Sequence, residues 1–268
     1  MAVPERRFAQ ALQDLCGDWI ANAACPLVAS GMIGSRQGWI EAPYLPCPAG
    51  LDQAAAQLAQ VEVKPGVVLH IVPGLTCTGG NGQADVMRGE ETQLWGAGLA
   101  DGSCCVLPGT HSKWAWMGAG GSVQRFQTAM TGELYAVLIQ HSILGRGMAF
   151  GHDDAAAFAA GVQLGLAEHG NATHVIFAAR SAGLMGRIAA EGLPDFLSGI
   201  LIGVEIGGAL QVQRPDTVAL LGDSALCGRY ATALALAGVA STRVADDATI
   251  RGQWRVAVQA GLVEGTTT

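Results

Sequence analysis

The sequence has few charged and few aromatic residues. Of its 268 residues, 14% are charged and 6% are aromatic, whereas 50% are hydrophobic. This hydrophobic content excludes a disordered chain, and the length allows one large domain or two small ones with buried cores. Basic residues are fewer than acidic ones: 15 Lys and Arg stand against 22 Asp and Glu, for a net charge of −7. We therefore expect no nucleic-acid partner, because such proteins need a basic surface.

Signatures of several enzyme classes are absent. There is no GxxxxGK[ST] phosphate loop, no complete GxGxxG fingerprint, no HExxH and no GxSxG elbow. The six histidines lack the spacing of a zinc site, so no metal-ligating side chain is predicted. The seven cysteines include no CxxC pair, which favours reduced thiols in the cytoplasm. Cys104 and Cys105 open an apolar run and are expected on a buried strand.

No segment is predicted to be a secretory signal or a membrane span. The first residues, MAVPERRFAQAL, lack the apolar core of a signal peptide, so we expect a cytoplasmic protein. The most apolar long stretch is 196–212, but Glu205 lies near its centre and several glycines interrupt it. It is also shorter than the ~20 residues of a span. We expect a buried helix there and no membrane partner.

Strand-like and helix-like patterns alternate along the chain, which predicts an α/β architecture in two parts that join near residues 100–103. Helices are expected at 5–22, 51–58, 90–95, 131–144, 153–168, 182–191, 194–210, 224–237 and 248–263. Strands are expected at 27–29, 67–72, 104–107, 113–116, 123–128, 176–177 and 218–221. We interpret residues 104–116 as one strand with a polar kink at 108–111, followed by a hairpin.

The most informative motif is VLPGTHSKW, residues 106–114. An apolar strand leads into a turn at Gly109 and Thr110, and His111 and Lys113 follow directly. Exposed backbone N–H groups, a hydroxyl and an ammonium group together suit a phosphate. The alternative is a plain β-turn with a solvated lysine, which the spacing alone leaves open.

Charged residues also gather at a predicted helix start, where Arg88 precedes Glu90 and Glu91. The guanidinium suits a substrate carboxylate, and either acid suits the role of general base toward a sugar hydroxyl. The two acids equally suit the positive end of a helix dipole, and without further context that structural role is favoured.

Two further glycine-containing loops follow predicted strands. Residues 31–39 include Arg36 and Trp39, whose indole suits either stacking on a sugar or packing in the interior. Gly222 and Ser224 lie between a strand and a helix, which suits a nucleotide but is also typical of an ordinary Ser-capped helix.

In this order, the segments resemble the 2-dehydro-3-deoxygalactonokinase family. The resemblance rests on SGMIGSRQGW, APYLPCPAG, DVMRGEETQLWGA, VLPGTHSKW, FQTAMTGELYAVLIQHSILG and LLGDSALCGRYATALALAG. It extends over nearly the whole chain from Phe8, and the combination of MRGEETQ, PGTHSKW and MTGEL is specific.

The resemblance implies a kinase of the actin–hexokinase–heat-shock superfamily, with a ribonuclease H-like ATPase fold of two α/β lobes around a cleft. Residues 1–102 would then form the sugar-acid lobe and residues 103–268 the nucleotide lobe. The expected reaction uses ATP and Mg²⁺ to phosphorylate the 6-hydroxyl of 2-dehydro-3-deoxy-D-galactonate in galactonate breakdown. The expected partners are these small molecules, and the hydrophobic content also allows a homodimer.

The resemblance also suggests roles for single residues. The nucleotide would be bound at its phosphates by Gly109, Thr110, His111 and Lys113, and on its adenosine side by the loop with Gly222 and Ser224. The sugar acid would be bound by Arg36, Trp39 and Arg88, and Glu90 or Glu91 would be the base.

Kinases of this superfamily begin with a strand and an Asp-x-Gly-Thr loop that positions Mg²⁺, and the sequence has no such motif. It starts in the helix expected after that loop, which suggests a misplaced start codon or a truncation. We therefore expect an incomplete first lobe, poor stability and little kinase activity from these 268 residues. The alternatives are an impaired pseudokinase that binds sugar acids and a kinase for a related keto-deoxy sugar acid.

Overall fold

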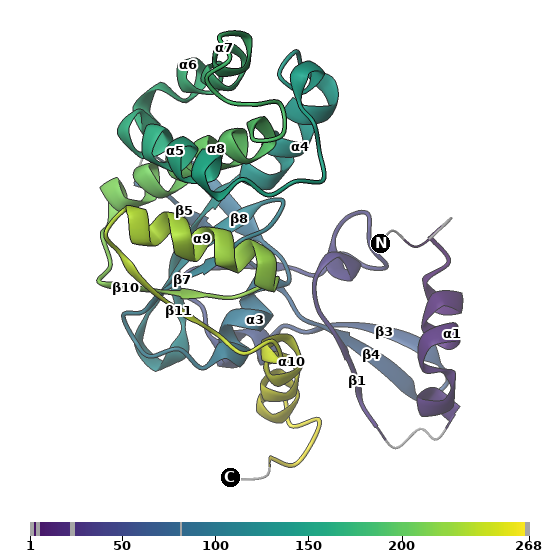
Figure 1. The fold of residues 1–268 in the computed structure, drawn as a ribbon. Helices are drawn as coiled ribbons and strands as arrows, with labels where there is room; N and C mark the ends of the chain where they lie inside the picture. Colours follow the sequence, from purple (N-terminus) through teal and green to yellow (C-terminus); the bar gives the residue numbers. More distant parts are fainter. Residues whose placement is uncertain (1–2, 4–5, 22–24, 81, 266–268) are drawn as a thin grey trace. The chain divides into compact units, whose positions relative to one another are not determined.

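A computed structural model describes residues 3, 6–21, 25–80 and 82–265 (Figure 1). The chain divides into two compact units. Unit 1 comprises Met1–Gly102, Ala115–Phe126 and Ala245–Thr268, and unit 2 comprises Ser103–Trp114 and Gln127–Val244. One boundary lies at the predicted join, between residues 102 and 103. The segments Ala115–Phe126 and Ala245–Thr268 belong to unit 1, although the sequence predicted them in the second of the two parts.

Unit 1 contains two three-stranded sheets. The first has the order β1–β4–β3, with β1 (Leu27–Ala29) parallel and β3 (Ala59–Lys64) antiparallel to β4 (Val67–Ile71). The second has the order β2–β5–β6, with β2 (Tyr44–Pro46) parallel and β6 (Ala84–Met87) antiparallel to β5 (Gly74–Thr78). The strands predicted at 27–29 and 67–72 are confirmed, whereas the other four were not predicted.

The helices of unit 1 are α1 (Phe8–Ala21), α2 (Leu51–Ala56), α3 (Glu90–Ala97) and α10 (Ala248–Gln259), with a short 3₁₀ turn, η2 (Met32–Gly34). Helix α10 packs closely on α3, although about 150 residues separate them in the sequence. Glycine allows this approach: a Cβ on Gly96 would lie 1.8 Å from the Ala248 carbonyl oxygen, and one on Gly252 would lie 1.8 Å from the Thr92 carbonyl oxygen. The C-terminal helix is therefore part of unit 1.

A five-stranded sheet of order β11–β10–β7–β8–β9 forms the centre of unit 2, although residues 115–117 of β8 and 123–126 of β9 are assigned to unit 1. Its strands are β7 (Cys104–Leu107), β8 (Ser112–Met117), β9 (Val123–Ala129), β10 (Thr217–Leu220) and β11 (Ala240–Arg243). A short 3₁₀ turn, η3 (Ala119–Gly121), lies between β8 and β9. Strand β10 is parallel to both β7 and β11. All four residues of β7 are buried, which confirms the expectation for Cys104 and Cys105.

The predicted single strand with a kink at 108–111 is wrong. Strand β7 ends at Leu107, and β8 begins at Ser112 as its neighbour in the sheet. Pro108 has no N–H to continue the ladder of β7, and a turn follows it. Residues 108–111 therefore connect two adjacent strands.

The helices of unit 2 are α4 (Thr131–His141), α5 (Ala155–Ala167), α6 (Ala172–Val175), α7 (Ala178–Leu184), α8 (Leu193–Val212) and α9 (Ser224–Leu236), with short 3₁₀ turns η4 (Gly145–Gly147) and η5 (His169–Asn171). Figure 1 shows α5 and α8 side by side. Helix α8 is long and apolar enough to cross a membrane, but 78% of its apolar window is buried in the protein. This burial supports the prediction of a core helix.

Two elements predicted between α5 and α8 are wrong. Ile176 and Phe177 are not a strand: Ile176 directly follows α6, and Phe177 directly precedes α7. Two apolar residues are too short a run to define a strand, and Ile176 packs into the helical core of unit 2 instead. The helix predicted at 182–191 is α7, which ends at Leu184 because Gly186 adopts a φ of 64° and the Arg187 N–H donates to the Ala182 carbonyl, 2.9 Å away.

Candidate active site

The turns that follow β7 and β10 lie together in unit 2. These strands are parallel neighbours, with Leu220 opposite Val106 in the register. The Leu221 N–H donates to the Val106 carbonyl at 3.0 Å, and a Cβ on Gly222 would lie 3.5 Å from the Pro108 carbonyl oxygen. The structure thus brings the Gly109 turn and the Gly222 loop to one edge of the sheet, where open α/β sheets bind ligands.

The first turn of α4 packs against the backbone of the Gly109 turn. The Glu133 N–H donates to the Thr110 carbonyl at 3.0 Å, and a Cβ on Gly132 would lie only 2.5 Å from the Gly109 carbonyl oxygen. The side chains of His111 and Glu133 also hydrogen-bond each other, through Nε2 and Oε2. A glycine at position 132 is therefore needed for this contact between the turn and the helix.

Lys113 is not a solvated lysine. Its residue is 4% exposed on β8, and its Nζ donates to the His111 carbonyl oxygen at 2.8 Å. The ammonium group therefore supports the turn from inside unit 2 and places a positive charge next to its backbone.

Asp223, rather than Ser224, caps α9. Its Oδ1 accepts a hydrogen bond from the Leu226 N–H at 2.9 Å, whereas Ser224 is the first residue of the helix. The predicted Ser cap is therefore off by one residue. Gly222 has a φ of 142°, and its carbonyl accepts a hydrogen bond from Arg243 Nη2 at 3.0 Å. The first N–H groups of α9 follow this loop directly.

Gly109 is one of the residues that line a cavity of about 270 Å³ in unit 2. Its lining is mostly apolar and includes Leu201, Ile202 and Leu226. Polar groups come from Asp195 and Arg229, whose Oδ1 and Nη1 atoms are 2.7 Å apart. A largely apolar cavity with a few fixed polar groups is typical of a small-molecule site.

Glu205 on α8 accepts hydrogen bonds from three elements of unit 2. Its Oε1 accepts from Trp114 Nε1 at 2.8 Å, and its Oε2 accepts from the Tyr230 hydroxyl at 2.7 Å and from the Thr131 hydroxyl. Ser112 Oγ lies 2.8 Å from the Tyr230 hydroxyl. Burial raises the pKa of Glu205, and the hydrogen bonds oppose that rise. No role was predicted for Glu205; its signal in the sequence was that it is the only carboxylate in the apolar stretch 196–212.

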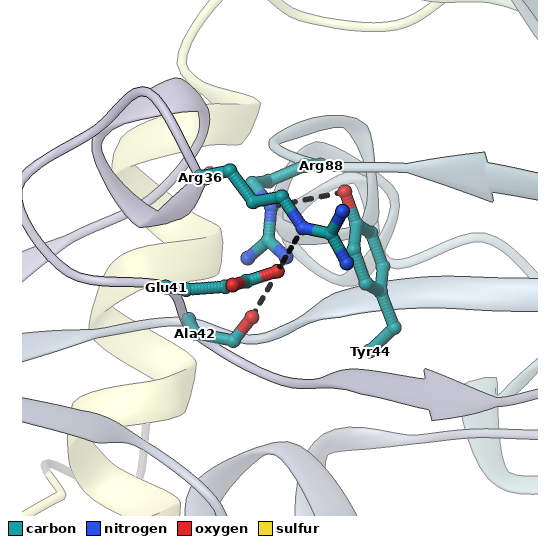
Figure 2. A network of polar contacts seen from close by, with 5 residues as sticks. All are labelled: Arg36, Glu41, Ala42, Tyr44 and Arg88. Atoms are coloured by element: carbon teal, nitrogen blue, oxygen red, sulfur yellow. Dashed lines mark hydrogen bonds and ion pairs between the residues drawn. The ribbon is translucent and has the colours of Figure 1, made fainter.

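Arg36 and Arg88 lie near Tyr44 in unit 1, in different surroundings (Figure 2). Arg36 is exposed, and its Nε lies 2.9 Å from Glu41 Oε1. Arg88 is buried: its Nη2 donates to the Ala42 carbonyl at 2.8 Å, its Nε to the Tyr44 hydroxyl at 3.4 Å, and its guanidinium carbon lies 4.1 Å from the Tyr44 ring centroid. Arg88 thus holds the segment that leads into β2.

Glu90 and Glu91 both accept backbone hydrogen bonds at the start of α3. Glu90 Oε2 accepts from the Arg88 N–H at 3.1 Å, and Glu91 Oε2 accepts from the Gly89 N–H at 2.6 Å. Glu91 Oε1 also accepts from the Thr92 hydroxyl. Glu91 is fully buried, which raises its pKa to about 7, whereas Glu90 is partly exposed. Only Glu90 therefore offers surface to a ligand.

The loop that carries Arg36 comes close to this helix start. A Cβ on Gly89 would lie 3.2 Å from Gly31 Cα, and both glycines have positive φ, 112° and 86°. Trp39 stacks on Phe8, with ring centroids 6.0 Å apart and an interplanar angle of 14°. One face of the indole is thus covered by another side chain.

Within the described ranges, no group of three or more His, Cys, Asp or Glu residues is arranged to hold a metal ion. A dedicated metal centre made only of protein ligands is therefore not part of the described structure.

Comparison with known proteins gives consistent matches. The family model "2-keto-3-deoxy-galactonokinase" matches residues 1–256. The 2-dehydro-3-deoxygalactonokinase of Escherichia coli (strain K12) is 37% identical over 244 residues, which are 89% of this chain and 80% of that protein. DgoK1 of Rhizobium meliloti (strain 1021), named a probable 2-dehydro-3-deoxygalactonokinase, is 39% identical over 249 residues, 90% of this chain and 80% of that protein.

A solved structure is also similar. It is the crystal structure of a Sinorhizobium meliloti protein provisionally named 2-dehydro-3-deoxygalactonokinase, with 36% identity and a TM-score of 0.85. The match covers 94% of this chain and 85% of that one. The α/β fold and the family resemblance expected from the sequence are confirmed. The chain belongs to the 2-keto-3-deoxy-galactonokinase family, a family of sugar kinases.

Proposed function

We propose that the protein transfers the γ-phosphoryl group of ATP to the 6-hydroxyl of 2-dehydro-3-deoxy-D-galactonate. The identity of 37–39% to two relatives over about nine-tenths of the chain carries this proposal. In the reaction, a bond forms between O6 of the sugar acid and the γ-phosphorus, and the bond from that phosphorus to the leaving oxygen of ADP breaks. The proton of the hydroxyl passes to a base.

The nucleotide binds to unit 2 in this proposal. Its phosphates lie against the backbone N–H groups of the Gly109–Thr110 turn and the Gly222 loop, next to the start of α9 and near Ser224. The aligned N–H groups of a helix start and of a tight turn attract anions. Lys113 adds a positive charge behind the turn, and His111 flanks it. The cavity lined in part by Gly109 holds the nucleoside, because its apolar walls suit a flat base.

In this proposal, Mg²⁺ would be supplied by its complex with the nucleotide, and its chemical contribution would be to neutralise negative charge on the phosphate oxygens. The described residues contain no cluster of three potential ligands, so they do not fit a dedicated metal centre, and no step is assigned to a protein-held ion.

The sugar acid binds to unit 1. Arg36 is the accessible cation, since its side chain is 80% exposed and its partner Glu41 can be exchanged for the substrate carboxylate. Arg88 is buried and shapes the site by holding Ala42 and Tyr44. Trp39 borders the same loop, where it packs on Phe8. Glu90 is the base, because Glu91 is fully enclosed and its two oxygens hold Gly89 and Thr92.

We also propose that the protein is cytoplasmic and forms a homodimer. The seven cysteines are all free thiols in the structure, which suits a reducing compartment.

The test is ADP release in the presence of single acceptors. The 268-residue chain, and the same chain extended by the in-frame codons upstream of Met1, are incubated with Mg·ATP and one 2-keto-3-deoxy sugar acid at a time. We expect the galacto acid to give the highest kcat/KM, above its gluco epimer. Preference for the epimer would support the related-kinase alternative, and sugar-acid binding without ADP release by either chain would support the pseudokinase.

A further inference from the structure

The buried carboxylate of Glu205 connects the parts of unit 2 that carry the candidate phosphate-binding groups. Trp114 and Ser112 lie on β8, directly after the Gly109 turn. Thr131 is the first residue of α4, the helix whose next residue contacts that turn. Tyr230 lies on α9, which begins after the Gly222 loop, and also lines the cavity. One side chain thus accepts hydrogen bonds from three elements that meet at the site.

Stability alone does not explain a carboxylate at this position. The buried residues of α8 are apolar apart from Asp195 and Glu205, and a buried ionisable group is often replaced by an apolar one without loss of stability. The hydrogen bonds do, however, fix geometry. The bond to Thr131 sets the start of α4, where Gly132 approaches the Gly109 carbonyl and the Glu133 N–H bonds to Thr110. A shift of this helix start would move the turn.

We infer that Glu205 is a positioning residue for nucleotide binding, which holds the Gly109 turn and the Tyr230 side of the cavity in the arrangement that binds a nucleoside di- or triphosphate. The inference rests on the proposed function, because it assumes that the turn binds phosphates. Glu205 itself touches no phosphate in this account. It acts through Thr131, Trp114 and Tyr230.

Two substitutions at this position separate charge from hydrogen bonding. In Glu205→Gln, the amide oxygen can accept from Trp114 Nε1 while the amide N–H groups donate to the hydroxyls of Thr131 and Tyr230, which then act as acceptors. Glu205→Leu removes the carboxylate that Trp114 Nε1 and the hydroxyls of Thr131 and Tyr230 share as an acceptor. If hydrogen bonding positions the turn, Gln retains the function and Leu loses it.

The test measures the dissociation constant of Mg·ADP by isothermal titration, together with the melting temperature and the KM for the sugar acid. We expect Glu205→Leu to raise the dissociation constant at least about tenfold, a factor that corresponds to about 1.4 kcal/mol. We expect Glu205→Gln to stay within about threefold of the parent, and the sugar-acid KM to change little in either variant. If the role of Glu205 were purely structural, Glu205→Leu would lower the melting temperature without a selective rise in the dissociation constant of Mg·ADP.

Leu197→Ala is the matched control, because Leu197 is also buried on α8 but belongs to the apolar core of unit 2. It should lower the melting temperature and leave the Mg·ADP dissociation constant unchanged. If Glu205→Leu does not fold, Thr131→Val replaces it, and its dissociation constant should rise as well. Folded Glu205→Leu or Thr131→Val that binds Mg·ADP like the parent overturns the inference alone. A parent protein that binds no Mg·ADP overturns the proposed function and the inference with it.

Discussion

At the scale of single residues, two fully or nearly enclosed carboxylates lie beside the candidate residues, one within unit 1 and one within unit 2. Glu91 accepts a backbone hydrogen bond at the start of α3 in unit 1, and Glu205 accepts hydrogen bonds from β8, α4 and α9 in unit 2. Both are costly to ionise, because burial removes the water that would solvate the charge. The structure compensates with several hydrogen-bond donors at each carboxylate.

The enclosure of Glu91 predicts a specific dependence of stability on pH. Its pKa is about 7 in the folded protein and close to 4.5 when unperturbed. Between these values the folded state holds a proton that the unfolded state has lost, so the free energy of unfolding falls as pH rises. The difference amounts to roughly 3 kcal/mol. Glu91→Gln cannot ionise, so its melting temperature, relative to the parent, should rise from pH 4.5 to pH 8.

If the melting temperatures of Glu91→Gln and the parent differ by the same amount at every pH in that range, Glu91 does not cause the predicted pH dependence of stability.

The Glu91→Gln variant also tests which of the two glutamates is the base. Glu91→Gln should retain most of the kcat, whereas Glu90→Gln should lose about a hundredfold or more. The reverse order would assign the base to Glu91.

Arg36 and Arg88, the two arginines predicted to bind the sugar acid, should respond differently to substitution. Arg88→Lys should lower the free energy of unfolding by about 1–3 kcal/mol, because lysine cannot replace the two hydrogen bonds and the contact with the Tyr44 ring. Arg36→Ala should leave the melting temperature nearly unchanged, since an exposed ion pair contributes little, but should raise the KM for the sugar acid. Thermal melts and steady-state kinetics on both variants measure this. A sugar-acid KM unchanged in Arg36→Ala would assign the substrate carboxylate to another group.

At the scale of secondary-structure elements, close backbone contact holds the core helices of unit 2 together. A Cβ on Gly199 of α8 would lie 2.2 Å from the Phe158 carbonyl oxygen, and one on Gly161 of α5 would lie 2.2 Å from the Phe196 carbonyl oxygen. Each position therefore needs glycine, although glycine lowers the intrinsic helix propensity.

Helix α8 offers a matched pair of glycines for testing this packing. Gly199→Ala should lower the free energy of unfolding by about 3 kcal/mol or more, because the new methyl group collides with backbone atoms that cannot move aside. Gly208→Ala lies on the same helix with no atom within 4 Å of its new Cβ, and should be stabilising by up to about 1 kcal/mol. Denaturant unfolding measures both. Equal effects at the two positions would mean that α5 and α8 are not packed as described.

The helices and strands also show how much of the secondary structure could be predicted from the sequence. Most helices with a repeating apolar pattern or a clear breaker were found, including α1, α5, α8 and α10. Strands β2, β3, β5, β6 and β11 were missed, because each is short and half-exposed or follows a proline, and pairing with neighbours decides such strands. The Gly109 turn was identified because proline, glycine and polar residues interrupt a buried strand. The hydrogen bond from the Glu133 N–H of α4 to the Thr110 carbonyl of this turn could not be predicted, because it depends on tertiary contacts that no local pattern encodes.

At the scale of the whole molecule, the alternation of strands and helices was enough to predict an α/β fold, and the ordered motifs were enough to predict the family. The candidate residues divide between the units, with all phosphate-binding candidates in unit 2 and all sugar-acid candidates in unit 1. The roles of single residues were harder to predict. Glu91 and Lys113 carry suitable chemical groups, but burial, which the sequence does not show, decides what those groups can reach.

The most direct test of the proposed reaction identifies its product. The protein, with any in-frame upstream residues included, is incubated with Mg·ATP and 2-dehydro-3-deoxy-D-galactonate, and the mixture is followed by ³¹P and ¹H NMR. We predict a new phosphomonoester signal coupled to the protons on carbon 6, formed in equal amount with ADP. ADP formed without a phosphorylated sugar acid, or a phosphate attached at another carbon, would contradict the account.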